Sequence, residues 1–295
     1  MNNYAQYLTR MTESTEHTTK ALIPVYASMC VANIEKPHIL EVGIGSCVIG
    51  KLVREAIPNA YLVGLDINKD NIENARQLGY YDRLSTQSVM DFEGREQFDL
   101  VIFSSVLHEI GSYDVHFVLD LNEKYTVDMM LRQAQWLTKT NGHIIIRDGL
   151  TESEELRNTI DTYFTEKHET LTKLYRFVEQ FKTYRQDDFK LDMFDVKTHV
   201  REKASVYYEI NCPRWLMREF LCTATWGDES WEREIKERFC FTDDETMRNM
   251  LNRHSFKIKT ALYSSEEYNT YFEKLISYPN IQNIIGFYVA EKEAW

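Results

Sequence analysis

Two hydrophobic periods alternate along the first half of the chain. Short apolar runs that end in a glycine or a polar residue predict buried strands, and apolar residues three or four positions apart between these runs predict helices. Alternation this regular indicates a parallel sheet with both faces covered. The predicted strands are residues 38–42, 61–65, 84–90, 98–103 and 143–146, and the helices between them are residues 48–56, 68–77 and 125–137.

The pattern changes after the fifth predicted strand and returns near the C-terminus. Residues 151–241 are charged and aromatic without a strong apolar strand, so we expect them to be mainly helical. From residue 242 we predict a helix, two strands (256–263 and 284–290) that pair as an antiparallel hairpin, and a short helix between them. The expected segments are an N-terminal helical cap (1–35), a Rossmann-like core (36–150), a helical insertion (151–241) and the C-terminal part of the core (242–295).

A glycine turn follows the first predicted strand and organises this core. Glu41 lies at the end of the apolar run, Gly43 and Gly45 follow, and helical periodicity begins at Val48. Glycines permit backbone conformations, and approaches to a ligand, that a Cβ would forbid. The N–H groups at the start of the following helix then face that ligand. Asp66 comes about twenty residues later at the end of the next strand, where nucleotide-binding βαβ folds hold ribose hydroxyls.

The order of these elements resembles the class I S-adenosylmethionine-dependent methyltransferases over residues 37–149 and 242–292. That family has a seven-stranded, mostly parallel sheet that ends in a reversed hairpin. Cys47 stands where the family often has a third small residue, which is a slight departure. The motifs that carry the resemblance are Glu41-x-Gly43-x-Gly45, Asp66 after the second strand, Asp91 after the third, and Phe98-Asp99-Leu100-Val101-Ile102 as the fourth strand.

The resemblance implies S-adenosylmethionine as the cofactor. The acid and the glycines of the first turn would hold its amino-acid moiety, and the acids after the second and third strands would bind the ribose and the adenine. A serine after the fourth strand would lie beneath the sulfonium. The implied cofactor-binding residues are Glu41, Gly43, Gly45, Asp66, Ile67, Met90, Asp91 and Ser104.

A dinucleotide-binding oxidoreductase is the nearest alternative, because it also combines a glycine turn with an acid at a strand end. Its fingerprint requires a third glycine at the position of Val48, and it usually has an apolar residue where Glu41 stands. The reversed C-terminal hairpin also favours the methyltransferase interpretation.

Catalytic residues are expected at the rim after the fourth and fifth strands, where acceptors bind in this superfamily. Methyl transfer requires an aligned acceptor, and a hydroxyl or protonated amine acceptor also needs a base. His108 and Glu109 are the predicted catalytic residues, with a purely structural helix histidine as the alternative for His108. Asp148 is predicted to contact the acceptor. No group of His, Cys and Asp residues has the spacing of a metal site, so we predict no metal.

The insertion is expected to select the acceptor. Arg214 and Trp215 are the predicted acceptor-binding residues, because aromatic and arginine side chains stack on planar groups. Most of the insertion's other aromatic residues are better explained as its own core. A small-molecule acceptor is the favoured hypothesis, and an RNA or nucleotide acceptor and a catalytically silent cofactor-binding protein are the alternatives.

Composition and charge narrow these alternatives. The net charge of −12 disfavours non-specific binding to nucleic acid or to an acidic membrane, although it leaves room for a local basic patch. Five scattered cysteines without a Cys-x-x-Cys pair indicate free thiols in a reducing compartment. Residues 1–20 are polar, so no secretory signal is expected, and no apolar run is long enough to span a membrane. We therefore expect a cytoplasmic enzyme of undetermined oligomeric state.

Overall fold

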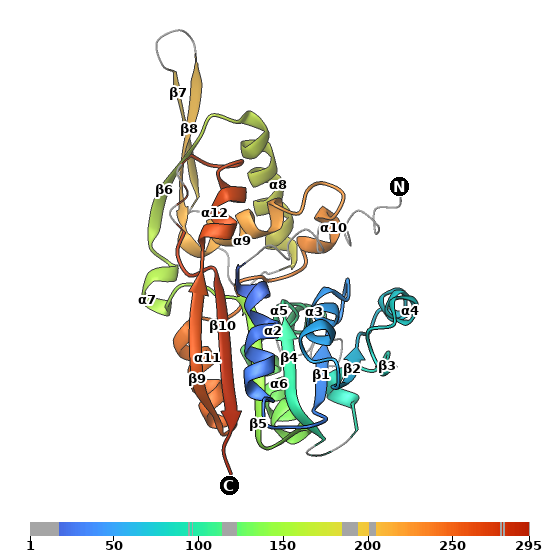
Figure 1. Ribbon diagram of the computed structural model, residues 1–295. Coiled ribbons are helices and arrows are strands. Elements are labelled where there is room, and N and C mark those ends of the chain that lie inside the picture. Colours follow the sequence, from blue (N-terminus) through green and yellow to red (C-terminus); the bar gives the residue numbers. More distant parts are fainter. Residues whose placement is uncertain are drawn as a thin grey trace. The chain divides into compact units, whose positions relative to one another are not determined.

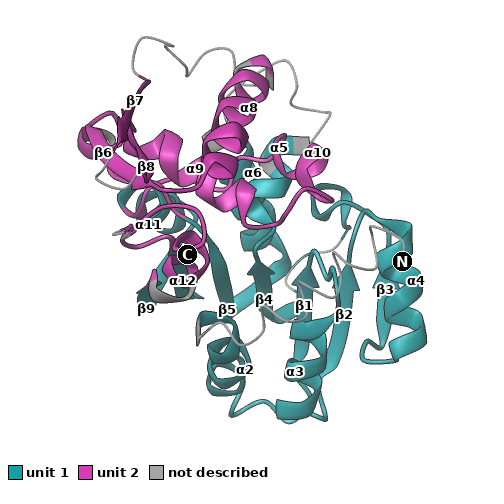
Figure 2. Cartoon of the chain, turned by 90° about the horizontal axis from the view of Figure 1, so that it is seen from above, with its two compact units in different colours: residues 1–149, 245–263, 285–295 teal, residues 150–244, 264–284 magenta. Residues whose placement is uncertain are grey.

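The computed structural model describes residues 18–93, 95, 97–113, 123–184, 194–200, 205–277, 279 and 281–294. Residues 1–17 of the predicted N-terminal cap lie outside this set. The chain divides into two compact units, which Figure 2 shows in different colours. Unit 1 comprises residues 1–149, 245–263 and 285–295, and unit 2 comprises residues 150–244 and 264–284.

Seven described strands of unit 1 form one sheet in the order β3-β2-β1-β4-β5-β10-β9 (Figure 1). β1 to β5 pair in parallel, and β10 runs antiparallel to β5. This sheet confirms the predicted fold class, including the reversed strand near the C-terminus. Its strands are β1 (His38–Val42), β2 (Tyr61–Leu65), β3 (Arg83–Ser85), β4 (Phe98–Ser104), β5 (Thr138–Gly149), β9 (Phe256–Ser264) and β10 (Ile285–Lys292).

Helices cover both faces of this sheet. In Figure 2, α2 and α3 lie on one face, and α5 and α6 lie on the other. Asn68 begins α4 by accepting a hydrogen bond from the Asp70 N–H, and Gly79 ends it in the left-handed conformation at φ 72°. The helices of unit 1 are α2 (Thr18–Cys30), α3 (Val48–Ala56), α4 (Lys69–Leu78), α5 (Leu107–Tyr113), α6 (Glu123–Leu137) and α11 (Asp244–Arg253), with a 3₁₀ helix, η2 (Val89–Asp91).

A continuous apolar core holds the strand ends in place. Ile39, Leu100 and Ile102 of the parallel strands pack with Ile23 of α2 and Val53 of α3, and all five side chains are buried. Each such side chain contributes about 1.5–3 kcal/mol through burial. The carboxyl ends of β1, β2, β4 and β5 therefore present their polar residues from a rigid base.

Two predicted strand boundaries were wrong. β3 covers only Arg83–Ser85, because the chain turns at Ser88, whose Oγ accepts a hydrogen bond from the Met90 N–H at 3.2 Å and caps η2. β5 begins at Thr138, directly after α6, and runs on to Gly149. A Cβ on Gly142 would lie 2.8 Å from the carbonyl oxygen of Lys139, so this irregular start of β5 requires a glycine.

Unit 2 contains a three-stranded antiparallel sheet in the order β6-β8-β7, which the sequence pattern does not predict. Its strands are partly exposed and carry charged residues, so they lack the apolar runs of unit 1. Aromatic side chains such as Phe177, Phe181 and Phe220 form the core of this unit. Its elements are α7 (Glu154–Arg157), β6 (Ile160–Thr165), α8 (His168–Tyr184), β7 (Asp195–Val200), β8 (Val206–Pro213), α9 (Arg214–Ala224), α10 (Trp231–Glu234) and α12 (Glu266–Phe272).

Two further sequence-based expectations can be compared with the structure. All five cysteines are free, as predicted, and four of them are buried. Within the described ranges, no helix has the length and apolar character needed to cross a bilayer.

Candidate active site

The glycine turn lies directly after β1 and is packed too tightly for side chains. Gly43 and Gly45 adopt φ angles of 73° and 44°, in the left-handed region that favours glycine. A Cβ on Gly43 would lie 2.4 Å from Val106 Cγ2, in the segment after β4. The N–H groups of Gly43 and Ile44 both donate to the carbonyl oxygen of Leu65, so the turn is held against the end of β2.

Asp66 links the ends of β1 and β2. Its Oδ2 accepts hydrogen bonds from the Gly45 N–H at 3.0 Å and from Asn71 Nδ2 at 2.9 Å, and its Oδ1 accepts one from the Asn68 N–H at 2.8 Å. The side chain is 9% exposed. The structure therefore brings the predicted ribose-binding acid onto the glycine turn, twenty-one positions away in sequence from Gly45.

Glu41 lies beneath the same turn in an apolar environment. It is 2% exposed, and its Oε2 accepts a hydrogen bond from Tyr81 Oη at 2.8 Å. Burial raises the pKa of Glu41 to about 8; the Tyr81 hydrogen bond opposes this shift, and the negative charge of Asp66 adds to it. Glu41 and Asp66 also raise the pKa of the neighbouring Cys47 thiol, after burial, to about 12. Ionised together, the two acids would repel each other, so a cation placed beside them would favour loss of the Glu41 proton.

Replacing Glu41 by glutamine tests this protonation. The folded protein holds a proton on Glu41 up to about pH 8, whereas the unfolded chain releases it near the ordinary value of 4.5. The free energy of unfolding of the wild type therefore falls as the pH rises from 4.5 to 8. In Glu41→Gln this contribution is absent, because glutamine does not titrate and can still accept from Tyr81.

Thermal unfolding between pH 5 and 9, without cofactor, measures the effect. We expect the melting temperature of Glu41→Gln minus that of the wild type to increase as the pH rises. Glu55→Gln, an exposed acid on α3, serves as the control and should follow the wild type. Parallel curves for wild type and Glu41→Gln would show that Glu41 is already ionised at pH 5.

The neighbourhood of Glu41 also contains a residue whose role the sequence did not reveal. Tyr81 lies two positions after Gly79, and its ring packs over two glycines of neighbouring elements. A Cβ on Gly50 of α3 would lie 2.1 Å from Tyr81 Oη, and one on Gly64 of β2 would lie 2.9 Å from Tyr81 Cδ1. Two glycines inside a buried helix and a buried strand were the available signal that a large side chain lies across them.

The remaining predicted cofactor residues are less closely associated with the glycine turn. Ile67, next to Asp66, is 69% exposed, and Asp91 is exposed at the end of η2. Met90 is half-buried in η2, and Ser104 Oγ is buried at the end of β4 without a hydrogen-bond partner. The structure thus assembles Glu41, Asp66 and the glycines around one turn, while contacts of Asp91 with the cofactor stay a prediction.

His108 and Asp148 form a buried pair at the ends of β4 and β5. His108 Nδ1 lies 2.5 Å from Asp148 Oδ1, and the two side chains are 5% and 2% exposed. Asp148 Oδ2 also accepts from the N–H groups of Val106 and Leu107, at 3.1 and 2.7 Å, so the carboxylate fixes the start of α5. A carboxylate that accepts from these backbone groups also suits a protonated Nδ1, a tautomer that would make Nε2 the basic ring nitrogen.

This pairing changes the interpretation of Asp148. The sequence led us to expect a direct contact with the acceptor, but both carboxylate oxygens are already used within the chain, Oδ1 accepting also from the Gly149 N–H at 2.8 Å. A contact of Asp148 with the acceptor stays a prediction, and the hydrogen bonds of the structure place its carboxylate at His108 Nδ1. Glu109 follows His108 on α5 and is half-buried.

The predicted acceptor-binding residues of unit 2 have partners within that unit. Arg214 Nε donates to Asp161 Oδ2 at 2.7 Å, and this hydrogen bond raises the pKa of the guanidinium. Trp215 is 4% exposed and packs 6.2 Å from the Phe181 ring centroid. Their contact with an acceptor stays a prediction, and Trp215 belongs to the core of unit 2.

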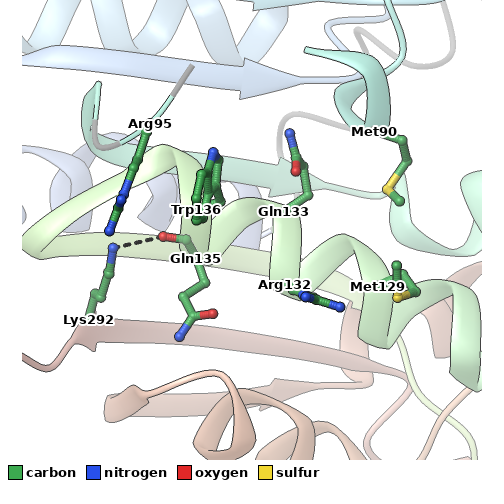
Figure 3. A pocket seen from close by; sticks show the side chains of 8 residues that line it. All are labelled: Met90, Arg95, Met129, Arg132, Gln133, Gln135, Trp136 and Lys292. Carbon is green, nitrogen blue, oxygen red and sulfur yellow. Dashed lines mark hydrogen bonds between the residues drawn. The ribbon is translucent and has the colours of Figure 1, made fainter. Parts of the chain in front are cut away.

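A pocket of about 780 Å³ lies beside α6 in unit 1 (Figure 3). Arg95 lies over the ring of the half-exposed Trp136 at 4.6 Å, and Lys292 Nζ donates to the Gln135 carbonyl oxygen at 2.8 Å. Met90, a predicted cofactor-binding residue, lines this pocket, whereas the acids of the glycine turn and His108 do not. Its lining residues are Met90, Arg95, Met129, Arg132, Gln133, Gln135, Trp136 and Lys292.

Residues 35–231 match the family model described as a methyltransferase domain. Over 141 residues the chain is 27% identical to ribosomal RNA small subunit methyltransferase C of Haemophilus influenzae, which corresponds to 45% of this chain. The chain spans only 39% of that relative's length.

Similar solved structures include the CurJ carbon methyltransferase, with a TM-score of 0.52 at 12% identity, over 97% of this chain and 58% of that one. Another is the 1,6-didemethyltoxoflavin-N1-methyltransferase of Burkholderia thailandensis, with a TM-score of 0.46 at 11% identity, over 99% of this chain and 89% of that one. At this level of identity the likeness to CurJ concerns the fold alone.

Proposed function

The chain belongs to the methyltransferase-domain family, within the class I S-adenosylmethionine-dependent methyltransferases, and on this premise we propose that it methylates a small-molecule acceptor at the ends of β4 and β5. S-adenosylmethionine supplies an electrophilic methyl group on a sulfonium. The observation that carries the proposal is the buried His108–Asp148 pair at that edge of the sheet.

The residues around the glycine turn suit this cofactor. Its sulfonium and its α-ammonium group carry positive charge, and the turn has two acids beside it, Glu41 and Asp66, whose joint ionisation a nearby cation would favour. Gly43 and Gly45 leave room for a close approach of a ligand to the backbone. We therefore propose Glu41, the Gly43–Gly45 turn and Asp66 as the residues that hold it.

His108 is the proposed general base. Its Nδ1–H donates to Asp148, which fixes the ring and directs Nε2 away from that carboxylate. A proton leaving a hydroxyl or ammonium acceptor would be accepted at Nε2, and the Asp148 carboxylate would stabilise the resulting imidazolium. Because the ring is almost completely buried, bulk water is kept away from the basic nitrogen.

The net charge supports a small acceptor over RNA, because a chain of −12 repels a polyanion. Two observations favour RNA as a second candidate: the similarity to a ribosomal RNA methyltransferase, and the Arg95–Trp136 pair, which offers a cation beside an aromatic face. A cofactor-binding protein without transfer is the third hypothesis.

Incubation with methyl-labelled S-adenosylmethionine separates these three hypotheses. The protein is mixed either with a low-molecular-weight metabolite fraction or with deproteinised total RNA, and the label in each product is measured. We expect label in the metabolite fraction at a rate that changes little between 50 and 200 mM salt, since a small acceptor displaces few counterions. Label in RNA that falls steeply with salt would contradict the small-molecule proposal, and S-adenosylmethionine binding without label in either fraction would indicate the silent protein.

A further inference from the structure

Arg147, near the carboxyl end of β5, is a buried cation with an unused donor. Its side chain has no exposed surface. Nε donates to Thr19 Oγ1 of α2 at 2.9 Å, and Nη1 donates to Ser105 Oγ at 2.5 Å. Nη2 is buried and has no hydrogen-bond partner among the described residues. A guanidinium presents five N–H donors, so part of this one's hydrogen-bonding capacity is unfilled.

Arg218 in unit 2 is a buried guanidinium of the same protein in which every nitrogen has a hydrogen-bond acceptor. Arg218 is 3% exposed, and its Nε and Nη2 both donate to Glu152 Oε1, at 3.0 and 2.6 Å. Its Nη1 donates to the carbonyl oxygens of Leu150 and Asn283. Arg218 thus has a carboxylate partner, and each of its three nitrogens has an acceptor.

The surroundings of Arg147 are different. Its register neighbours are Ser104 on β4 and the buried Phe287 on β10, and no ion pair joins it to a carboxylate of the described residues. Ser104 Oγ is itself buried and without a partner. A buried charge without a counter-ion is costly, and adjacent strands place these two orphaned groups side by side. An anion between them would satisfy both.

We infer that Arg147 and Ser104 form a subsite for a carboxylate or phosphate group of the methyl acceptor. This inference rests on the proposed function. β5 is three strands from β2, which is about 14 Å, so the subsite is separate from the Asp66 end of the cofactor site. Arg147 and Asp148 are consecutive in β5, so their side chains point to opposite faces of the sheet, Arg147 toward α2 and Asp148 toward His108 of α5. The acceptor would then pass over the ends of β4 and β5, with its anionic group at Arg147 and its nucleophile near His108.

Calorimetric titration tests the subsite without knowledge of the acceptor. The full chain is saturated with S-adenosylhomocysteine and titrated with inorganic phosphate and with benzoate at constant chloride. We expect the wild type to bind at least one of these anions. Arg147→Lys keeps the charge but loses the forked donor pair, so its affinity should fall about tenfold or more. Ser104→Ala, a milder change in volume, should lower the affinity several-fold.

A matched control variant makes the result decisive. Arg218→Lys, at a second buried arginine of the described residues, should lower the melting temperature and leave the anion affinity unchanged. The proposal is overturned if neither anion binds the wild type, or if both site variants bind as the wild type does.

The cofactor's own carboxylate is the competing source of the anion. A loss of S-adenosylhomocysteine affinity in Arg147→Lys, with unchanged affinity for methylthioadenosine, which lacks the amino-acid moiety, would assign the subsite to that carboxylate and overturn the acceptor role. If the wild type failed to bind S-adenosylhomocysteine yet bound phosphate in an Arg147-dependent way, the proposed function would fail while the anion site stood.

Discussion

Replacing His108 by alanine should lower kcat about a hundred- to ten-thousandfold, which is the range that a positioned general base contributes. The affinity for S-adenosylhomocysteine should stay within about twofold of the wild type, because the proposed cofactor residues lie at the ends of β1 and β2 and His108 follows β4. Single-turnover rates and calorimetric titration of the same preparations measure the two quantities. A variant with the kcat of the wild type would show that His108 only fills space in α5.

Asp148→Asn examines how His108 is positioned. An amide at this place can donate to Nδ1, which would move the ring proton to Nε2 and remove the basic nitrogen from the acceptor side. We expect kcat to fall and its pH dependence to change, whereas a residue that only stabilises α5 would leave the pH profile unchanged. His143→Ala is the matched control, because His143 lies at the other end of β5, opposite Glu291 of β10.

The parallel strands of unit 1 could be predicted because each is a short apolar run buried on both faces. For β1 and β2 the predicted and observed boundaries coincide. Where local hydrogen bonds compete with the apolar pattern, as at Ser88, the prediction extended the strand too far. The strands of unit 2 were not predicted, because one face of their sheet is solvated. The polar side chains of β7 also obscure the alternation of apolar and polar residues that identifies a strand.

The candidate site could be predicted only in part, because motifs reveal positions but not partners. Strand ends and glycine spacing placed Glu41 and Asp66 at the turn. Nothing local indicated that Tyr81 would hydrogen-bond to Glu41, or that Asp148 would bind His108 forty positions away. Arg147 lies near a strand end in the sequence, but only the packing of three strands reveals that no carboxylate of the described residues pairs with it.

Asp66→Ala should weaken S-adenosylhomocysteine binding about ten- to hundredfold, because hydrogen bonds to a charged acceptor contribute roughly 1.5–3 kcal/mol. The same change removes the acceptor of the Gly45 and Asn68 N–H groups, so the melting temperature without ligand should also fall. Titration well below that melting temperature separates lost affinity from lost fold.

Methylthioadenosine and a nearby acid show where the lost affinity arises. Methylthioadenosine keeps the ribose, so Asp66→Ala should weaken its binding by the same factor as that of S-adenosylhomocysteine. Asp70→Ala removes an exposed acid from the first turn of α4, only four positions away, and should leave both affinities unchanged. If Asp66→Ala bound both ligands like the wild type, the carboxylate would serve only to hold the glycine turn. A loss restricted to S-adenosylhomocysteine would instead place Asp66 near the amino-acid moiety.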